Sequence, residues 1–206
     1  MKNIFSCVFP NQGFVGCELT NDELSPILEE VSAIQNNFEK SESMNYSLVG
    51  HVEHEYKIVK CCDYIDTLVE PLARVYDETF NNGIGIRHYK NNGIWVNFQK
   101  KNEFNPLHHH NGEYSFVIYV KIPYSMEEEN KTTSTVPENF RSNGCFTFYY
   151  TDTLGNIRPW VIPTDNSYEK RIVLFPARMN HAVMPFYSSD EYRISVAGNL
   201  EIKNER

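Results

Sequence analysis

The chain has 206 residues, 41% of them hydrophobic, which is enough for one sizeable core but not comfortably for two domains. Its formal net charge of −8 argues against a nucleic-acid partner, because Lys and Arg contacts to phosphate supply most non-specific affinity. Five irregularly spaced cysteines indicate reduced thiols rather than a disulfide framework. The apolar run at residues 4–9 is short and ends at Pro10, so we expect no signal peptide and no membrane association, and predict a cytoplasmic protein.

The chain begins with a predicted hairpin, followed by a helix. Two runs typical of strands, residues 4–9 and 14–19, flank the turn-forming sequence Pro-Asn-Gln-Gly. Apolar residues at three-and-four spacing then predict a helix over residues 24–38. Ser25 can cap this helix, and Pro26 is tolerated in a first turn.

A second helical pattern covers residues 63–80 and contains Pro71, which is expected to kink or divide it. We therefore expect one domain over residues 1–206. Within it, residues 1–80 form an N-terminal hairpin and helical support, and residues 81–206 form the core.

Residues 81–206 are predicted to be mainly β. Asn-Gly pairs that favour tight turns, including one at residues 92–93, separate short runs rich in β-branched and aromatic residues. This pattern is typical of an antiparallel sandwich or barrel of jelly-roll type, with helices flanking one sheet. The polar, aperiodic residues 124–143 are predicted to form a mobile loop near the mouth of a site. The predicted strands cover residues 84–89, 94–99, 113–122, 145–151, 172–175, 182–185 and 193–198.

Three adjacent histidines, His108, His109 and His110, stand just before the predicted strand at residues 113–122. Imidazole is the side chain most often offered to a metal. Residues two apart on a strand project to the same face, so His108 and His110 can converge while His109 faces away. His181 opens a later strand after a Pro turn and is the best-placed third ligand. An isolated histidine is more often a hydrogen-bonded structural residue, but the cluster favours a metal site.

Arg193 and Ser195 share one face of a predicted core strand, and Ile194 and Val196 share the other. A buried arginine is costly unless it meets a carboxylate. That carboxylate could be an Asp or Glu elsewhere in the chain. Alternatively, it could belong to a dicarboxylate ligand, bound by Arg193 with a hydrogen bond from Ser195; the position near the metal site favours the ligand.

These motifs together resemble a known family. A His-x-His pair, a later Leu-Phe-Pro…His strand, and Arg-x-Ser twelve residues after His181 look like the iron(II)- and 2-oxoglutarate-dependent dioxygenases. More narrowly, Trp95-Val96-Asn97 together with residues 105–113 is similar to a group of oxygenases common in phages and marine microbes. The resemblance covers roughly residues 84–200.

The resemblance implies a double-stranded β-helix, the cupin-like form of the jelly roll. It implies iron held by His108, by His110 or a nearby carboxylate, and by His181. It also implies 2-oxoglutarate held by Arg193 and Ser195. If the source is viral, the expected compartment is the host cytoplasm.

Position 110 departs from the family, which usually has Asp or Glu where His110 stands. Glu113 is one candidate for the carboxylate, and with it the ligand set also resembles that of metal cupins, with a spacer one residue short. Alternatively His110 replaces the acid, or water takes the place and His108 and His181 alone hold the iron. The Arg-x-Ser pair favours the oxygenase over a cupin-type enzyme or small-ligand binder that does not use 2-oxoglutarate.

Strand phase adds further candidates for the pocket. On the strand at residues 94–99, Asn97 and Gln99 lie opposite an apolar face. On the strand after the histidines, Ser115 and Tyr119 also share a face. Their hydroxyls could bind the 2-oxoglutarate carboxylates or make ordinary inter-strand hydrogen bonds.

The predicted function is hydroxylation of a C–H bond by an enzyme that uses Fe(II) and 2-oxoglutarate and releases succinate and CO2. The expected substrate is a small molecule or a peptidyl side chain such as proline or aspartate. A cupin-type enzyme or binder is the alternative, and a catalytically silent jelly-roll module is a third. The sequence does not predict the oligomeric state.

Overall fold

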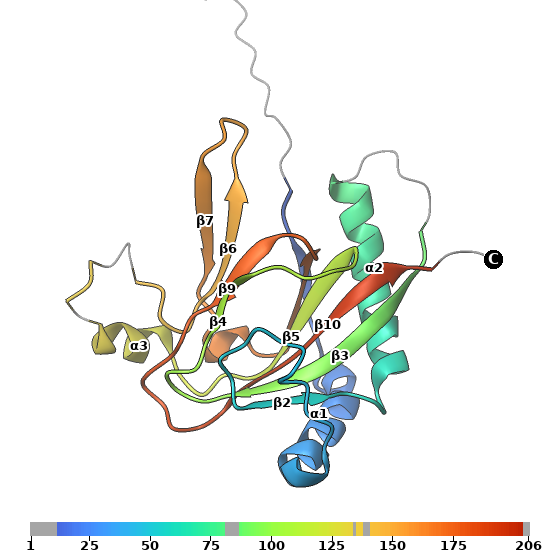
Figure 1. The fold of residues 1–206 in the computed structure, drawn as a ribbon, viewed down its shortest axis with the longest axis horizontal. Helices are drawn as coiled ribbons and strands as arrows, with labels where there is room; N and C mark the ends of the chain where they lie inside the picture. The colour runs from blue at the N-terminus through green and yellow to red at the C-terminus, as the bar shows by residue number, and fades with distance from the viewer. Residues whose placement is uncertain (1–11, 81–86, 134, 138–140, 204–206) are drawn as a thin grey trace, which may run out of the picture.

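Two antiparallel sheets form the framework of the molecule (Figure 1). The structure, a computed structural model, describes residues 12–80, 87–133, 135–137 and 141–203. The major sheet has six strands in the order β1-β8-β5-β10-β3-β2, and the minor sheet has four in the order β4-β9-β6-β7. The mainly β architecture with flanking helices is therefore confirmed.

The strand bounds are as follows. The major sheet contains β1 (Val15–Glu18), β8 (Arg171–Pro176), β5 (Tyr114–Lys121), β10 (Arg193–Ile202), β3 (Tyr89–Gln99) and β2 (His54–Lys57). The minor sheet contains β4 (Asn105–His108), β9 (Asn180–Val183), β6 (Phe146–Thr151) and β7 (Ile157–Ile162).

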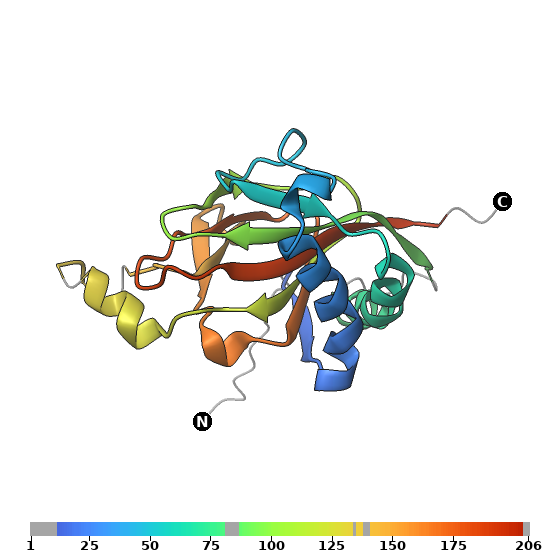
Figure 2. The same ribbon diagram turned by 90° about the horizontal axis from the view of Figure 1, so that it is seen from below.

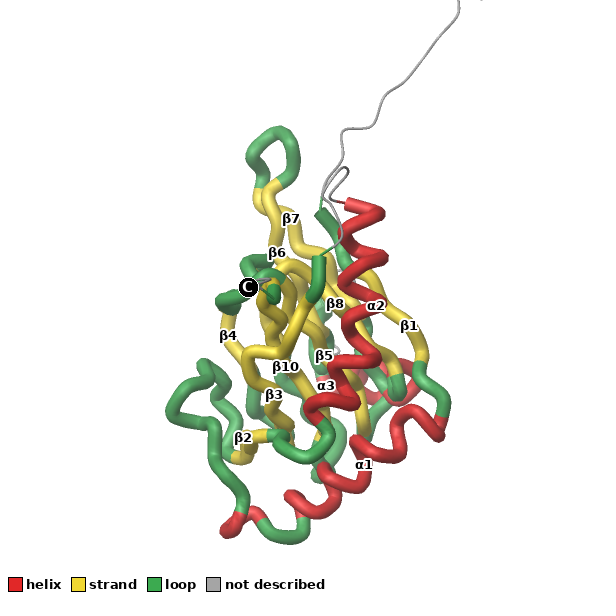
Figure 3. Tube along the Cα trace, turned by 90° about the vertical axis from the view of Figure 1, so that its right-hand side faces the viewer, coloured by secondary structure: helices red, strands yellow, loops and turns green. Residues whose placement is uncertain are grey.

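Two long helices cover one face of the major sheet, as Figures 2 and 3 show. They are α1 (Asn21–Gln35) and α2 (Cys62–Phe80), and a short third helix is α3 (Met126–Thr132). Short 3-10 turns are η1 (Phe38–Lys40) and η3 (Asn166–Tyr168). No helix in the described part of the chain is long and apolar enough to span a bilayer.

Both long helices were predicted, but their details differ. α1 begins at Asn21 rather than near residue 24, because Thr20 and Glu23 form a capping box that satisfies the first backbone N–H groups. Pro26 therefore lies in the second turn. α2 continues through Pro71, so the predicted division is wrong; Pro71 lies on the exposed side, where water can bond the carbonyl it leaves unpaired.

Six of the seven strands predicted within residues 81–206 correspond to strands of the two sheets. The seventh, at residues 84–89, lies partly outside the described residues, and of its described part only Tyr89 belongs to a strand, β3. Three further corrections follow. The Asn-Gly sequence that predicted a turn lies inside β3, because β10 pairs with β3 on both sides of an irregularity between Gly198 and Leu200, and Gly93 adopts a positive φ of 112°. α3 occupies part of the predicted mobile loop. The first strand of the predicted hairpin lies outside the described residues, and β1, which overlaps the second, pairs with β8.

Two apolar clusters fill the interior. One lies between the helices and the major sheet and includes Ile94, Val96 and Phe98 of β3. The other lies between the two sheets and includes residues of β5, β8 and β6. Because side chains alternate along a strand, the major sheet has one face toward the helices and one toward the space between the sheets. We call these the helix face and the pocket face.

Candidate functional site

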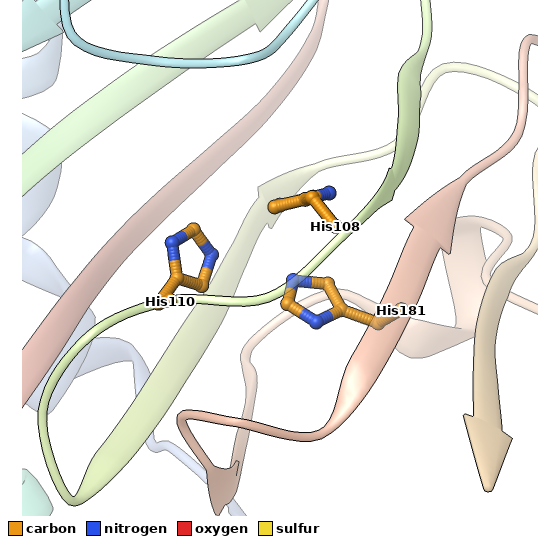
Figure 4. Close-up of side chains that lie close together, drawn as sticks. All are labelled: His108, His110 and His181. Atoms are coloured by element: carbon orange, nitrogen blue, oxygen red, sulfur yellow. The ribbon is translucent and has the colours of Figure 1, made fainter.

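Three histidines converge in the space between the sheets (Figure 4). His108 ends β4 and His181 lies in β9, and the two are directly opposite in the antiparallel register. His110 follows two residues after His108. Their candidate ligand atoms all lie within 4.8 Å of one another. His109 is exposed, as the strand alternation predicts.

Backbone carbonyls orient two of the three imidazoles. Nδ1–H of His108 donates to the carbonyl of Pro106 at 2.6 Å, and Nδ1–H of His181 donates to the carbonyl of Met179 at 2.9 Å. A carbonyl oxygen has no proton to give, so each imidazole is the donor. The Nε2 lone pair is then free to bind a metal.

Burial keeps all three imidazoles neutral at pH 7. Desolvation, with like-charge repulsion from neighbouring imidazoles, lowers the pKa of His181 to about 3 and of His110 to about 4. The same causes lower the pKa of His108, against a hydrogen bond to Pro106 that raises it. Metal binding requires the neutral form, so the site is prepared for a cation over a wide pH range.

Arg193 is the first residue of β10 and only 3% exposed. Its Nη1 donates to the Tyr124 hydroxyl and to the Gly144 carbonyl, both at 2.8 Å, and its Nη2 donates to Oε1 of Gln99 at 2.5 Å. All three acceptors are neutral. No carboxylate of the described residues forms an ion pair with this guanidinium. The alternative in which an Asp or Glu of the chain neutralises Arg193 therefore has no support among these residues. A buried, uncompensated cation of this kind attracts an anionic ligand.

Nine of the ten predicted site residues line a single cavity of about 60 Å³. They are His108, His110, His181, Arg193, Ser195, Ser115, Tyr119, Asn97 and Gln99. β3, β5 and β10 place the non-histidine members on the pocket face, at alternating positions along each strand. The cavity therefore joins the candidate metal ligands to the candidate anion anchor.

The polar members of this set differ in their bonding. Ser115 Oγ donates to Oδ1 of Asn199 at 2.7 Å, and Asn97 Nδ2 lies 3.5 Å from Ser195 Oγ. The Tyr119 hydroxyl, in contrast, is buried without a hydrogen-bond partner among the described residues.

Glu113 is the one predicted residue that the structure does not bring to the cavity. Its Oε1 accepts a hydrogen bond from Nη1 of Arg87 at 3.2 Å in a partly exposed ion pair. It lies outside the cluster of ligand atoms. Glu113 immediately precedes β5, after a turn in which Gly112 has a positive φ of 110°, and its backbone pairs with Leu200 instead.

Several cavity residues were not predicted from the sequence. Glu55 of β2, Asn105 of β4 and Thr164 also line the cavity, and Tyr124 and Gly144 hold Arg193. Glu55 lies in β2, a strand of four residues. This strand is too short for an alternation of apolar and polar residues to show which of its faces is buried. Tyr124 and Gly144 lie in or beside the segment predicted as a loop.

The residues present fit an iron ion and a dicarboxylate cosubstrate. Three neutral imidazoles supply nitrogen donors suited to Fe(II). Within the described ranges of the chain, Arg193 supplies a charge without a counter-ion, and the Tyr119 hydroxyl supplies a buried polar atom without a hydrogen-bond partner. Buried polar groups in native proteins are usually paired, so such an atom indicates a site for a ligand.

Among solved structures, the fold is similar to several prolyl hydroxylases. A prolyl-4-hydroxylase of Pseudomonas putida matches with a TM-score of 0.57 at 14% identity, over 91% of each chain. A Trichoplax adhaerens prolyl hydroxylase, bound to a hypoxia-inducible-factor peptide fragment, matches with a TM-score of 0.56 at 13% identity, over 93% of this chain and 83% of its own. The viral collagen prolyl hydroxylase of Paramecium Bursaria Chlorella virus-1, in a 2-oxoglutarate complex, matches with a TM-score of 0.51 at 12% identity, over 91% and 94%.

No curated protein matches the sequence. Residues 93–199, more than half of the chain, match the family described as "Putative 2OG-Fe(II) oxygenase". This family uses Fe(II) and 2-oxoglutarate, which decides between the oxygenase and the cupin-type alternative. The protein is thus an oxidoreductase, and its chain belongs to the 2OG-Fe(II) oxygenases.

Proposed function

We propose that the protein hydroxylates a C–H bond of a peptidyl side chain, such as proline or aspartate, or of a small molecule, with release of succinate and CO2. The observation that carries this proposal is that three neutral histidines and an uncompensated arginine line the same cavity. The two groups match the two partners that the family requires, a metal cation and a dicarboxylate.

We assign the metal to His108, His110 and His181. Two of these imidazoles are fixed by their Nδ1–H bonds, which leaves Nε2 as the donor atom. His110 stands where the family usually has a carboxylate. Three neutral ligands leave the metal centre one negative charge short of the usual set, which makes it a stronger attractor of anionic cosubstrate.

We assign the far carboxylate of 2-oxoglutarate to Arg193. The Tyr124 hydroxyl, the Gly144 carbonyl and Gln99 hold the guanidinium in place before the ligand arrives, so little side-chain entropy remains to be lost. Tyr119, whose hydroxyl faces the same cavity, and Ser195 supply further hydrogen bonds.

When bound, Fe(II) and 2-oxoglutarate supply the oxidising chemistry, in which O2 and 2-oxoglutarate give succinate and CO2 and one oxygen atom enters the substrate C–H bond. The chain's own contribution is to bind and orient. Phe146 and Phe175 pack against the His181 ring, with centroids at 5.3 and 4.9 Å, and exclude water from that side.

The substrate is proposed to enter beside the histidines. A second, more open cavity of about 330 Å³ shares Trp95, His108 and His110 with the first, so the two adjoin at the candidate metal ligands. One structural neighbour is bound to a peptide fragment. Its fold supports a peptide as one candidate substrate for this chain.

The test is succinate formation from 2-oxoglutarate with Fe(II) and ascorbate, together with calorimetric titration of 2-oxoglutarate. The Arg193→Leu variant is expected to lose about 100-fold or more in 2-oxoglutarate affinity, because it removes a buried charged partner, while it retains metal binding. Arg178→Leu is the matched control, since Arg178 is exposed and lines no part of the cavity. Wild-type protein that neither binds 2-oxoglutarate nor forms succinate would contradict the proposal.

A further inference from the structure

Glu55 is a buried carboxylate in the wall of the cavity, 1% exposed. It lies in β2, directly opposite Asn97 of β3 in the sheet register. Its Oε2 atom has no hydrogen-bond partner among the described residues. A carboxylate removed from water in this way is expensive unless something compensates its charge.

Other buried carboxylates of the described chain have such compensation. Glu30 accepts hydrogen bonds from the backbone N–H groups of residues 59–61. Glu129 accepts from the backbone of Tyr187 and Ser188. Asp77 accepts from two tyrosine hydroxyls, those of Tyr89 and Tyr114. Glu55 differs from all three in that an oxygen remains unpaired.

No cation of the described residues forms an ion pair with Glu55. The charged group that acts on its pKa is another carboxylate, that of Glu103. Arg193 lines the same cavity, but its guanidinium donates hydrogen bonds to Gln99, Tyr124 and Gly144. The negative charge of Glu55 is therefore not compensated from within the described protein.

Two amide oxygens accompany Glu55. Oδ1 of Asn97 and Oδ1 of Asn105 also line the cavity as buried atoms without partners among the described residues. A side chain at Gly50 would bring its Cβ within 2.6 Å of Asn105 Oδ1 and 2.7 Å of Glu55 Oε1, so these two groups surround one point. Residue 50 thus has to be glycine for both acceptors to approach it.

We propose that Glu55, Asn97 and Asn105 bind an alkylammonium group of the substrate, a deduction that rests on the proposed function. A primary ammonium is a positive charge with three N–H donors and no acceptor. It would meet three acceptor oxygens, Oε2 of Glu55 and Oδ1 of Asn97 and of Asn105, which have no partner in the part of the chain that the structure describes. Within the range of substrates proposed above, the substrate class is accordingly a primary amine, such as a lysine side chain or a small aliphatic amine, rather than a proline or aspartate side chain.

The charges in the cavity also favour different places for 2-oxoglutarate and for the proposed amine substrate. Arg193 attracts the dianionic cosubstrate and repels a cation, whereas Glu55 attracts an ammonium and repels a carboxylate. Burial and Glu103 raise the pKa of Glu55 to about 7, and an ammonium beside it would lower that pKa again.

The test uses two matched pairs of probes that differ only in the charged nitrogen. One pair is Nα-acetyl-lysine amide and Nα-acetyl-norleucine amide, and the other is n-butylamine and n-butanol. Each is titrated calorimetrically into the 206-residue chain loaded with Mn(II) and 2-oxoglutarate. In at least one pair the amine is expected to bind about tenfold tighter than its neutral partner, the size of a hydrogen bond to a charged group.

Glu55→Gln is expected to reduce this preference to about twofold or less, because the variant keeps the shape and loses the charge. Glu53→Gln is the matched control: Glu53 immediately precedes β2, its side chain is 65% exposed, and it should keep the wild-type preference. Equal binding of amine and neutral partner in both pairs, failure of both amines to bind, or an unchanged preference in Glu55→Gln would each overturn the proposal.

Failure of the proposed function has a different signature. It appears as wild-type protein that does not bind 2-oxoglutarate in the same titrations, whatever the amines do. If 2-oxoglutarate binds and the amine preference is absent, only the assignment of Glu55 is wrong.

Discussion

Asp77 on the helix face of the major sheet and Glu55 on its pocket face are both buried carboxylates, but they differ in their hydrogen bonding. On the helix face, Asp77 of α2 accepts hydrogen bonds from Tyr89 and Tyr114 at 2.5 Å each. On the pocket face, Glu55 and Tyr119 carry buried oxygens without partners among the described residues. A saturated buried group stabilises the fold, whereas an unsaturated one costs stability and indicates where a ligand binds.

Whether a buried polar group has all its hydrogen bonds thus distinguishes a structural residue from a ligand-binding one better than its burial does. Asp77 and Glu55 are 9% and 1% exposed, and by exposure alone both would count as core residues. Their hydrogen bonds distinguish them, because both oxygens of Asp77 accept from tyrosines and Oε2 of Glu55 has no partner among the described residues. Substitution of a saturated buried group such as Asp77 should therefore reduce stability and spare ligand binding, and substitution of an unsaturated group on the pocket face should do the reverse.

The largest effect on the pocket face is expected from His181→Ala. Loss of one of three ligands should reduce metal affinity by more than about 100-fold, the upper range for loss of a supporting group, and abolish succinate formation. His109→Ala is the control, because His109 is exposed and adjacent to two of the ligands. Metal titration followed by electron paramagnetic resonance with Mn(II) measures both. Wild-type metal affinity in His181→Ala would remove the histidine cluster from consideration as the metal site.

On the helix face, Asp77→Ala should cost about 4 kcal/mol of unfolding free energy, because two tyrosine hydroxyls lose their acceptor and a small cavity remains. Affinities for metal and 2-oxoglutarate should stay at wild-type values. Urea denaturation measures the stability change. Glu78→Ala, an exposed neighbour in α2, should change stability by less than about 0.5 kcal/mol. A large loss of 2-oxoglutarate affinity in Asp77→Ala would show that the two faces are not separable.

Glu55 should make the free protein less stable as the pH rises. Its pKa is raised from 4.5 to about 7 in the folded state, so the folded protein binds more protons than the unfolded chain between these values. Glu55→Gln should therefore match wild type near pH 4 and exceed it by up to about 3 kcal/mol at pH 8. Urea denaturation at several pH values tests this, since the contribution of the histidines is shared by both proteins. A less stable Glu55→Gln at pH 8 would reveal a protein partner for the carboxylate.

The smallest effects separate two hydroxyls predicted to bind 2-oxoglutarate. Tyr119→Phe removes an unpaired hydroxyl, so it should cost no stability but weaken 2-oxoglutarate binding about tenfold, if that hydroxyl bonds the ligand. Ser115→Ala removes the bond to Asn199 and should cost about 1 kcal/mol with little change in affinity. Thermal denaturation and calorimetry give both quantities. If Ser115→Ala weakened 2-oxoglutarate binding and Tyr119→Phe only reduced stability, Ser115 would be the ligand-binding hydroxyl and Tyr119 the structural one.

Strand alternation explains why much of the site was predictable. The period of two along β3, β5 and β10 assigned Asn97, Gln99, Tyr119 and Arg193 to one face without any knowledge of strand order. The same rule separated His109 from its neighbours. Residues brought together by one strand's own geometry can be found from the sequence.

Features that depend on neighbouring strands were harder to predict. β7 is an edge strand whose residues are exposed until Ile162, and it contains Pro159, so it shows no alternation. The Asn-Gly sequence in β3 has strong turn propensity, which pairing with β10 overrides. α3 had a visible signal, the capping box of Ser125 and Glu128, although the segment is otherwise polar. Glu55 lines the cavity together with residues far from it in the sequence, such as Asn105 and Arg193, and no local pattern predicts this arrangement.

The cross-strand pair of His108 and His181 has a mechanical consequence. β4 is a four-residue edge strand whose register with β9 has only two paired positions, Asn105 with Val183 and His108 with His181. A metal ion held by both histidines would cross-link residues 108 and 181 and close the intervening loop, much as a disulfide does. The backbone amide of Leu107 should then exchange with deuterium more slowly when metal is bound. The same ion that takes part in the reaction would thus also stabilise the edge strand of the minor sheet.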